Sequence, residues 1–197
     1  MKEDKCLLRK ALRNSPCGGD DGGICKHILS HPWFQAADTV MAFAAIAGEP
    51  KIMPVLQEVL RLGKKLVLPR CEADGTMTGR YLRKIQELVS GTMGILEPSE
   101  EAPVAMCSEI DLILAPGMAF DRSGGRLGRG KGYYDRFLAG YTGRTIGICY
   151  QGNLLEAIPM EQHDKRMDAV VTDQTIIMCE TEGDACLKRS ADKRQKK

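Results

Sequence analysis

Two short apolar runs with an amphipathic segment between them constrain the fold of this chain most strongly. Residues 39–45 form a largely apolar run of strand length, and residues 66–68 form a second one, which Pro69 is expected to close. Between them, residues 50–62 carry apolar side chains at helical spacing, and Gly63 suits the end of a helix. A strand, a helix and a strand in this order predict a βαβ unit, and therefore a parallel sheet covered by helices.

The rest of the chain continues this alternation. Further strands are expected at residues 111–115, 145–150 and 169–172, the last of them being the final strand. Helices are expected at residues 2–13, 24–31, 132–139 and 154–158, with a loop at the glycine cluster 18–23 and a hairpin or excursion within 73–103. The pattern predicts an α/β fold over residues 1–186: a single three-layer domain with a largely parallel sheet flanked by helices.

The composition excludes several classes of protein. With 43% hydrophobic and 27% charged residues, this chain of 197 residues is not disordered as a whole. It holds no apolar stretch of the length that a membrane helix needs, so no membrane partner is expected. Its first residues lack the apolar segment of a signal peptide, which predicts a cytoplasmic protein.

The net charge of +2 is distributed unevenly along the chain. Residues 187–197 carry a net charge of +5, which leaves −3 for residues 1–186. A nucleic-acid-binding domain carries its positive charge on a folded surface, so no nucleic-acid partner is expected. The basic segment is interpreted as a disordered tail, and the protein as a monomer or weak homo-oligomer.

The eight cysteines do not form a recognisable metal or redox motif, because no two of them have CxxC spacing. The closest set combines Cys17 and Cys25 with His27 and His31, but these cysteines lack a zinc-knuckle arrangement. The set is interpreted as a chance grouping. Reduced thiols are expected, with Cys149 in the core.

The segment Gly124–Gly132, with the sequence GGRLGRGKG, has the composition of an anion-binding loop. It follows the expected strand at 111–115, and ligands of parallel sheets bind beyond the carboxyl ends of the strands. Glycines let backbone N–H groups approach an anion, and the N-terminus of the next helix adds partial positive charge. Residues 122–136 also carry a net charge of +4, which favours a polyphosphate ligand.

Two common phosphate-binding motifs do not fit this loop. Gly125, Gly130 and Lys131 match the first seven positions of a P-loop, but Gly132 replaces the residue whose hydroxyl binds Mg²⁺. The glycine spacing also fails the dinucleotide-binding fingerprint. If Mg²⁺ accompanies a nucleotide, Asp135 is the nearest carboxylate ligand. A flexible surface hairpin with solvated charges is the alternative, and it explains the alternation of glycines and cations less well.

Several motifs, in fixed order, resemble those of the 5-formyltetrahydrofolate cyclo-ligase family. The most specific is DLILAPGMAFD at residues 111–121 followed by GRLGRGKGYYD at 125–135. Weaker matches occur at residues 5–9, 68–70, 94–98 and 164–168. The resemblance implies a three-layer α/β fold. It also implies conversion of 5-formyltetrahydrofolate to 5,10-methenyltetrahydrofolate with ATP and Mg²⁺, through an iminium phosphate, with release of ADP and phosphate.

The resemblance also implies roles for individual residues. Arg129 and Lys131 are the catalytic candidates, since their charges can offset charge on a phosphoryl group in transfer. Asp135 and Asp164 match the positions that bind Mg²⁺. The residues expected to bind ATP are Lys5, Arg9, Arg126, Leu127, Gly128, Arg129, Gly130, Lys131, Gly132, Tyr133 and Tyr134. Those expected to bind the folate are Ala44, Glu49, Arg129, Gly130, Lys131, Gly132 and Tyr133.

Three questions stay open from the sequence. Glu49 either contacts the pterin or serves as an acid at a helix N-terminus. Of Tyr133 and Tyr134, one is expected to stack on the pterin and the other to pack against the following helix. The alternatives to the cyclo-ligase are a phosphate-binding sugar isomerase or CoA-transferase-like enzyme, and a non-catalytic nucleotide- or RNA-binding module.

Overall fold

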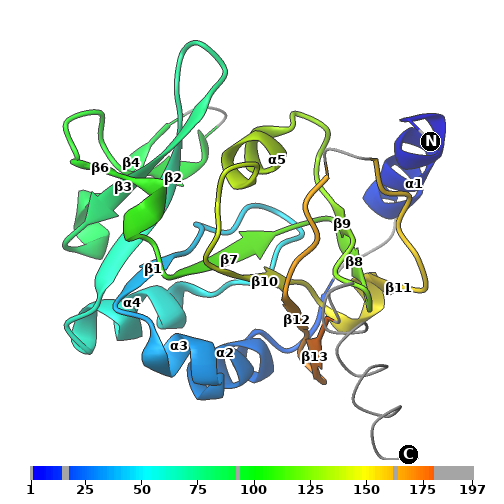
Figure 1. Ribbon diagram of the computed structural model, residues 1–197, viewed down its shortest axis with the longest axis horizontal. Helices are drawn as coiled ribbons and strands as arrows, with labels where there is room; N and C mark the ends of the chain where they lie inside the picture. The colour runs from blue at the N-terminus through cyan, green and yellow to red at the C-terminus, as the bar shows by residue number, and fades with distance from the viewer. Residues whose placement is uncertain (1, 15–17, 92–93, 162–163, 180–197) are drawn as a thin grey trace, which may run out of the picture.

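The computed structural model describes residues 2–14, 18–91, 94–161 and 164–179 of the chain (Figure 1). An eight-stranded sheet of order β13-β12-β10-β7-β1-β2-β3-β6 forms its centre, beside a three-stranded sheet β11-β8-β9 and a β4–β5 pair. Cys17 and the predicted tail at 187–197 lie outside the described residues.

The helices and strands have the following bounds. The helices are α1 Lys2–Arg13, α2 Asp21–Ser30, α3 Pro32–Ala36, α4 Met53–Arg61 and α5 Tyr133–Leu138. The strands of the main sheet are β1 Thr39–Met41, β2 Lys65–Cys71, β3 Met77–Leu82, β6 Val104–Ala105, β7 Leu112–Pro116, β10 Arg144–Ile148, β12 Ala169–Val171 and β13 Ile176–Met178. The remaining strands are β4 Val89–Ser90, β5 Leu96–Glu97, β8 Ala119–Asp121, β9 Arg126–Leu127 and β11 Leu154–Leu155. Short 3₁₀ helices cover η1 Ile85–Glu87, η3 Cys107–Glu109 and η4 Gln151–Asn153.

The centre of the main sheet is parallel, as the sequence predicts. β1 pairs in parallel with β2 and β7, and β10 pairs in parallel with β7 and β12. The β1-α4-β2 unit confirms the predicted βαβ arrangement. Antiparallel strands complete both edges, because β3 returns from β2 in a hairpin and β13 returns beside β12. Within residues 73–103, the antiparallel pair of β4 and β5 confirms the hairpin, which was one of the two expectations for this segment.

Helices cover both faces of the main sheet and produce three layers (Figure 1). α2, α3 and α4 lie along one face, where alternate strand residues such as Val40 and Leu114 pack with them in a buried cluster. α5 lies along the other face, where the intervening residues such as Met41 and Ile113 form a second cluster with Leu138. Side chains of alternating direction on buried strands thus supply two separate cores.

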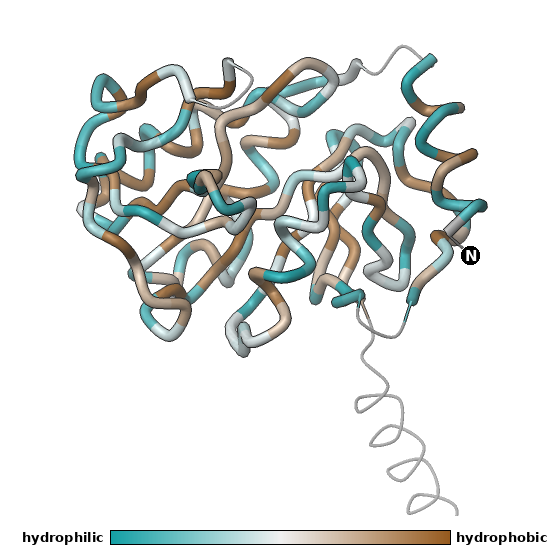
Figure 2. The backbone as a smooth tube through the Cα atoms, turned by 90° about the horizontal axis from the view of Figure 1, so that it is seen from above, coloured by the Kyte–Doolittle hydropathy of each residue, from teal (hydrophilic) through white to brown (hydrophobic). Residues whose placement is uncertain are grey.

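α1 lies apart from these layers and packs on the small sheet (Figure 1). Hydrophilic and hydrophobic residues alternate along it (Figure 2). Leu8 and Leu12 contact the cluster of Ala119, Leu127 and Ile158, so the apolar side of the helix faces β8 and β9. Among the described helices, none has both the length and the apolar character needed to cross a bilayer.

Two predictions for the first half of the chain are wrong. Pro69 does not close β2, which continues to Cys71. The strand tolerates the missing N–H because β1 ends at Met41, so Pro69 pairs only with Gly79 of β3. The glycine cluster is not all loop either, because α2 begins at Asp21 and its N-terminus is capped by the Asp20 carboxylate.

The remaining corrections concern the last third of the chain. Residues 154–158 do not form a helix, since Leu154 and Leu155 pair with β8 as strand β11. β12 is not the final strand, because β13 follows it at the edge of the main sheet. The glycine loop is also partly strand, with β9 at Arg126–Leu127 pairing with β8. In each case pairing with another strand, rather than periodicity, decides the local structure.

Candidate active site

A pocket of about 360 Å³ lies where the carboxyl ends of the parallel strands meet the glycine loop. Phe43 and Ala44 follow β1, Cys71 ends β2, and Gly117 follows β7, so three neighbouring strands contribute to its wall. The described residues that line it are Arg13, Phe43, Ala44, Ile46, Glu49, Pro69, Cys71, Met77, Ile95, Glu97, Pro116, Gly117, Arg126, Gly128, Arg129, Lys131, Gly132, Tyr133, Tyr134 and Asp135.

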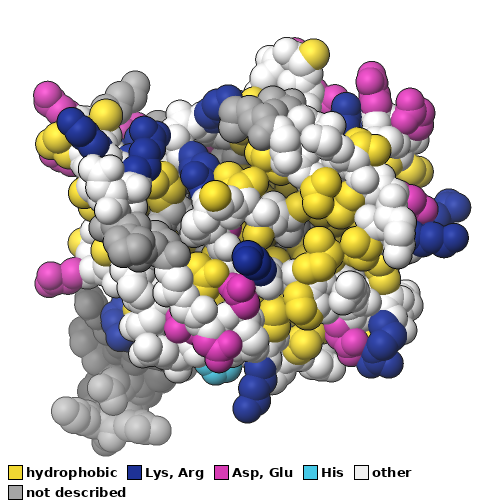
Figure 3. Space-filling model, turned by 180° about the vertical axis from the view of Figure 1, so that it is seen from behind, with side chains coloured by type: hydrophobic (Ala, Val, Ile, Leu, Met, Phe, Trp, Pro, Cys, Tyr) yellow, Lys and Arg dark blue, Asp and Glu magenta, His cyan; other side chains and the backbone are white. Residues whose placement is uncertain are grey.

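The pocket combines an apolar wall with a charged rim. Most of its exposed surface is apolar, contributed by side chains such as Phe43, Met77 and Ile95. Figure 3 shows one face of the molecule, where apolar side chains gather in a broad area with charged side chains of both signs within it and around it. Such a combination suits a flat ring system that carries a few polar groups.

The glycine loop has a backbone that only glycine allows at several positions. Gly124, Gly130 and Gly132 have φ values of 82°, 101° and 69°, in the left-handed region. A Cβ on Gly124 would also lie 2.2 Å from the carbonyl oxygen of Met167. The loop therefore lies directly against the segment that precedes β12.

Asp121 holds the base of the glycine loop. Its Oδ1 accepts hydrogen bonds from the backbone N–H groups of Ser123 and Gly125, at 2.9 and 2.8 Å, and from the Ser123 hydroxyl at 2.7 Å. Its Oδ2 accepts one from the N–H of Ile158 at 2.8 Å. Burial raises the pKa of Asp121. The hydrogen bonds from Ser123, Ile158 and Gly125 lower it by a larger amount, so the net shift is downward.

Arg126 and Asp135 form a half-buried ion pair in the pocket. Nη2 of Arg126 lies 2.5 Å from Oδ1 of Asp135, and Nη1 donates a hydrogen bond to the carbonyl of Pro116. The guanidinium also lies over the ring of Tyr134, 5.3 Å from its centroid. The side chain predicted to bind ATP is thus held between β7 and α5.

Glu49 is a buried carboxylate that also lines the pocket. Its Oε1 lies 3.2 Å from Nε of Arg129, and its Oε2 accepts a hydrogen bond from the N–H of Ile46. Burial raises the pKa of Glu49 and outweighs the lowering by these two partners. α4 begins at Met53 and has no acid in its first turn, so the interpretation of Glu49 as a helix N-terminal acid is wrong.

Lys5 and Arg9, the basic pair of α1, contact the neighbourhood of the loop rather than the pocket wall. The ammonium group of Lys5 forms an ion pair with the carboxylate of Asp164, and both side chains are buried. Nε of Arg9 donates a hydrogen bond to the carbonyl of Gly128 at 2.8 Å. The structure therefore brings the predicted ATP-binding pair together with one of the two predicted Mg²⁺ ligands.

Tyr133 and Tyr134 both line the pocket at the start of α5. The hydroxyl of Tyr134 is buried and has no hydrogen-bond partner among the residues that the structure describes, and burial raises its pKa strongly. Its ring packs against the core on the α5 face. Tyr133 instead lies beneath the guanidinium of Arg136, at 5.5 Å. Packing of one tyrosine is confirmed, and stacking of the other on a pterin stays a prediction.

Leu127 and Ala44 differ in how they contribute to the site. Leu127 is fully buried beneath α1, so any part it takes in ATP binding uses its backbone. Ala44 lines the pocket directly. Gly130 does not line the pocket, and its Cβ position lies 3.6 Å from the Arg9 guanidinium.

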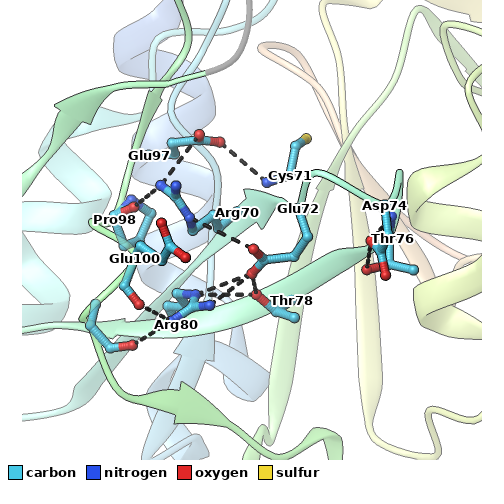
Figure 4. Close-up of polar contacts among 11 residues, drawn as sticks. Arg70, Cys71, Glu72, Asp74, Thr76, Thr78, Arg80, Glu97, Pro98 and Glu100 are labelled. Carbon is cyan, nitrogen blue, oxygen red and sulfur yellow. Dashed lines mark hydrogen bonds and ion pairs between the residues drawn. The ribbon is translucent and has the colours of Figure 1, made fainter.

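Sequence reasoning missed the wall formed by the β2–β3 hairpin and β5 (Figure 4). Glu97 of β5 is buried, its Oε2 accepts a hydrogen bond from the N–H of Cys71, and its Oε1 lies 3.5 Å from Arg70. Arg80 donates to Glu72 at 2.8 Å in the same network. Residues 68–70 and 94–98 matched the family separately, but no sequence signal showed that the two motifs meet.

The site has no activated cysteine. Cys71 lines the pocket, but burial raises the pKa of its thiol, and the charge of Glu97 raises it further. A thiol with a raised pKa stays protonated near neutral pH and is a poor nucleophile. Cys149 is buried in the core, as predicted. Among the described residues, no three His, Cys, Asp or Glu side chains converge on a metal position. Cys17, the fourth member of the set with Cys25, His27 and His31, lies outside them, so the interpretation of that set as a chance grouping stays a prediction.

Comparisons with known proteins agree with this geometry. The family model described as the 5-formyltetrahydrofolate cyclo-ligase family matches residues 8–173. The mitochondrial 5-formyltetrahydrofolate cyclo-ligase of Arabidopsis thaliana is 32% identical, over 89% of this chain and 76% of its own. The 5-formyltetrahydrofolate cyclo-ligase of Escherichia coli K12 is also 32% identical, over 74% of this chain and 83% of its own.

Solved structures match over nearly the whole chain. The 5,10-methenyltetrahydrofolate synthetase of Aquifex aeolicus has a TM-score of 0.80 at 30% identity, covering 90% of this chain and 93% of that one. The corresponding protein of Mycoplasma pneumoniae, at 23% identity and a TM-score of 0.69, shows the same fold. The chain therefore belongs to the 5-formyltetrahydrofolate cyclo-ligase family.

Proposed function

We propose that the pocket closes the ring of 5-formyltetrahydrofolate to give 5,10-methenyltetrahydrofolate, with consumption of ATP. The observation that carries the proposal is the junction of two unlike surfaces. The glycine loop offers cations and backbone amides at the carboxyl end of the sheet, and it adjoins an apolar pocket with the buried carboxylate of Glu49. The first surface suits a polyphosphate, and the second suits a pterin.

The chemistry explains why a site without a nucleophile is adequate. The oxygen of an N-formyl group is a poor leaving group, and transfer of the γ-phosphoryl group of ATP to it gives an iminium phosphate. N10 of the folate then attacks the formyl carbon and closes the ring. N10 gives up its proton to solvent or to the phosphate, and the C–O bond breaks as phosphate leaves. The protein must hold the two reactants in line and offset charge, which are tasks for cations and amides.

Each charged group of the pocket has a role in this proposal. Glu49 accepts hydrogen bonds from the amino and ring N–H groups of the pterin, which places the formyl group toward the loop. Arg129, whose partner is Glu49, and Lys131 carry positive charge on the loop beside the pocket. These two cations stabilise the phosphoryl group in transfer. Arg126 positions Asp135 through their ion pair.

Magnesium fits the site as a companion of ATP and not as a resident metal. The described residues form no cluster of three metal-binding side chains. Mg²⁺ in nucleotide sites is commonly held by one or two carboxylates together with phosphates and water. Asp135 supplies one such carboxylate at the pocket, and Asp164 is the second candidate. When bound, the ion would neutralise phosphate charge.

The alternative enzyme classes lack a supporting feature. A sugar isomerase needs a carboxylate free to move a proton, whereas Glu49, Glu97 and Asp135 are each paired with an arginine. Membership of a family of enzymes disfavours a non-catalytic binding module. The buried ion pairs of the pocket disfavour it as well, because buried charged groups in a cleft are typical of functional sites.

A single assay tests the proposed function. The protein is incubated with 5-formyltetrahydrofolate, ATP and Mg²⁺, and the near-ultraviolet absorbance of the methenyl product is followed. Product should form only when all three are present, with one ADP released per ring closed. Absence of product over a range of pH and divalent metals would refute the proposal. ATP consumption without product would point to a different acceptor.

A further inference from the structure

Arg13 lines the pocket, although no motif or proposed role accounts for it. It is the last residue of α1 and is exposed, so its guanidinium is available at the open edge of the pocket. A cation at the end of a helix also stabilises the negative end of the helix dipole. This purely structural role is the alternative that an experiment must separate from ligand binding.

The other arginines of the pocket are already paired within the protein. Arg126 pairs with Asp135, and Arg129 pairs with Glu49. Within the described part of the chain, Arg13 has no hydrogen-bond or ion-pair partner. A guanidinium without a protein partner beside a substrate-sized pocket is suited to a group that a ligand brings.

The docking of α1 determines where Arg13 lies. Lys5, Arg9 and Arg13 recur every four residues along one side of the helix. Lys5 pairs with Asp164, and Arg9 donates to the carbonyl of Gly128, so both residues hold the helix against the loop. Each step of four residues advances about 6 Å along the axis. The third cation therefore comes to lie beyond the loop, at the pocket.

We propose that Arg13 binds an oxyanion of a bound reactant at the open edge of the pocket. The two sources of this chemistry are a phosphate of ATP and a carboxylate of the folate's glutamate, and a guanidinium can donate two parallel hydrogen bonds to either. The inference rests on the proposed function, which supplies both reactants. In this proposal, Lys5 and Arg9 of the basic row Lys5, Arg9 and Arg13 hold α1 in place, and Arg13 contacts a ligand.

Calorimetric titrations with each reactant separately test the proposal. Arg13→Ala should raise the Kd about tenfold for one reactant, the size expected for loss of one charge-assisted hydrogen bond. A rise for ATP with Mg²⁺ identifies a phosphate. A rise for the folate identifies a carboxylate. The amide of 5-formyltetrahydropteroic acid, which has no carboxylate, should then bind wild type and variant equally. Arg13→Lys, which keeps the charge but loses the planar fork, should recover part of the affinity.

Lys10→Ala is the matched control, because Lys10 is an exposed cation of the same helix and does not line the pocket. Its Kd values should equal those of the wild type. A lower Tm for Arg13→Ala with both Kd values unchanged would overturn the proposal and leave only the helix-end role. Wild-type turnover is measured first: binding of both reactants without turnover refutes the proposed function alone, whereas failure to bind either refutes both.

Discussion

Glu49 and Arg126 are two buried charged residues of the pocket, and each has one main charged partner. Glu49 is 8% exposed and Arg126 is 7% exposed. Removing such groups from water is costly, and an oppositely charged partner offsets much of that cost. Their partners, Arg129 and Asp135, are more accessible. Binding of a ligand can therefore change the environment of the partner without exposing the buried charge.

The raised pKa of Glu49 predicts a pH-dependent affinity for the folate. The ionised carboxylate can accept hydrogen bonds from both N–H donors of the pterin, whereas protonation turns one of its oxygens into a donor. Affinity should therefore fall as the pH drops through the raised pKa of Glu49. Glu49→Gln should bind more weakly near neutral pH and lose this dependence. The Kd of 5-formyltetrahydrofolate, measured from about pH 5 to about pH 8 for both proteins, checks the prediction. Parallel profiles for the two would contradict it.

The raised pKa of Glu49 also predicts how the stability of the protein changes with pH. The folded state binds the proton of Glu49 more tightly than the unfolded state, so the stabilisation by this group is greatest below the unfolded pKa. The stability of the wild type relative to Glu49→Gln should decrease as the pH rises through the folded pKa. Urea unfolding of both proteins at several pH values measures that difference.

Lys131→Ala should weaken the use of ATP far more than the use of the folate. Loss of one charge-assisted contact to phosphate corresponds to roughly a 10- to 100-fold change in kcat/KM for ATP. Lys65→Ala is a matched control, because Lys65 is an exposed lysine at the amino end of β2, away from the pocket. Equal losses in the two variants would show that net charge, rather than the loop position, matters.

Among the elements, the β8–β9 turn determines the shape of the glycine loop. The turn is held by one carboxylate, Asp121, which also reaches the backbone of Ile158 after β11. Three strands of the small sheet and the loop thus share one buried acceptor. α1 then packs on this sheet and carries its basic row to the loop. The small sheet is therefore the support of the phosphate-binding half of the site.

Asp121→Asn should destabilise the protein by about 2 kcal/mol, because an amide NH₂ must face a backbone donor that the carboxylate now satisfies. It should also raise the KM for ATP by displacing the loop. The lowered pKa of Asp121 means that its stabilisation is present above the unfolded pKa and is lost as the pH falls through the folded pKa. The difference in unfolding free energy between the wild type and Asp121→Asn should therefore shrink as the pH falls.

Asp111→Asn provides the matched control for this prediction. Oδ2 of Asp111 accepts hydrogen bonds from the N–H groups of Asp38 and Thr39. Asp111 directly precedes β7, at the amino ends of the parallel strands, opposite the pocket. Its variant should lose stability with an unchanged KM for ATP. An unchanged KM in Asp121→Asn as well would show that the carboxylate acts on stability alone.

The topology of the main sheet determines where the site lies in the molecule. Five neighbouring strands run parallel, so their carboxyl ends meet at one edge of the sheet. β1, β2 and β7 contribute the apolar wall there, and the glycine loop follows β7 through β8 and β9. α1 reaches the same edge from the far end of the sequence. Residues 13, 49, 71 and 126 become neighbours of one pocket in this way.

Deletion of residues 187–197 should leave kcat and KM near their wild-type values. The family match ends at residue 173, and the deleted segment carries a net charge of +5 with few apolar residues. Steady-state kinetics on the full chain and the shortened chain check the prediction. A large loss of activity in the shortened chain would show that the segment contacts the site or the reactants.

Local sequence patterns predicted the central helices and strands. They failed where pairing between strands determines the local structure. The apolar runs and amphipathic segments predicted β1, α4 and β2 correctly, because the residues that form these elements are neighbours in sequence. Leu154 and Leu155 looked helical but pair with β8, and the Pro69 signal was overridden by the hairpin with β3. Strand pairing depends on a second segment of the chain, whether the adjacent β3 or the distant β8, so the periodicity of one segment alone cannot reveal it.

The sequence by itself determined the chemistry of the loop, the class of fold and the family, because glycine spacing, charge and ordered motifs are properties of the chain. Only the tertiary structure decided which charges are paired. It joined Lys5 to Asp164 and Arg129 to Glu49 across long separations, and it left Arg13 at the pocket without a partner among the described residues. An ion pair depends on the distance between two charges in space, and the local sequence around each charge does not determine that distance.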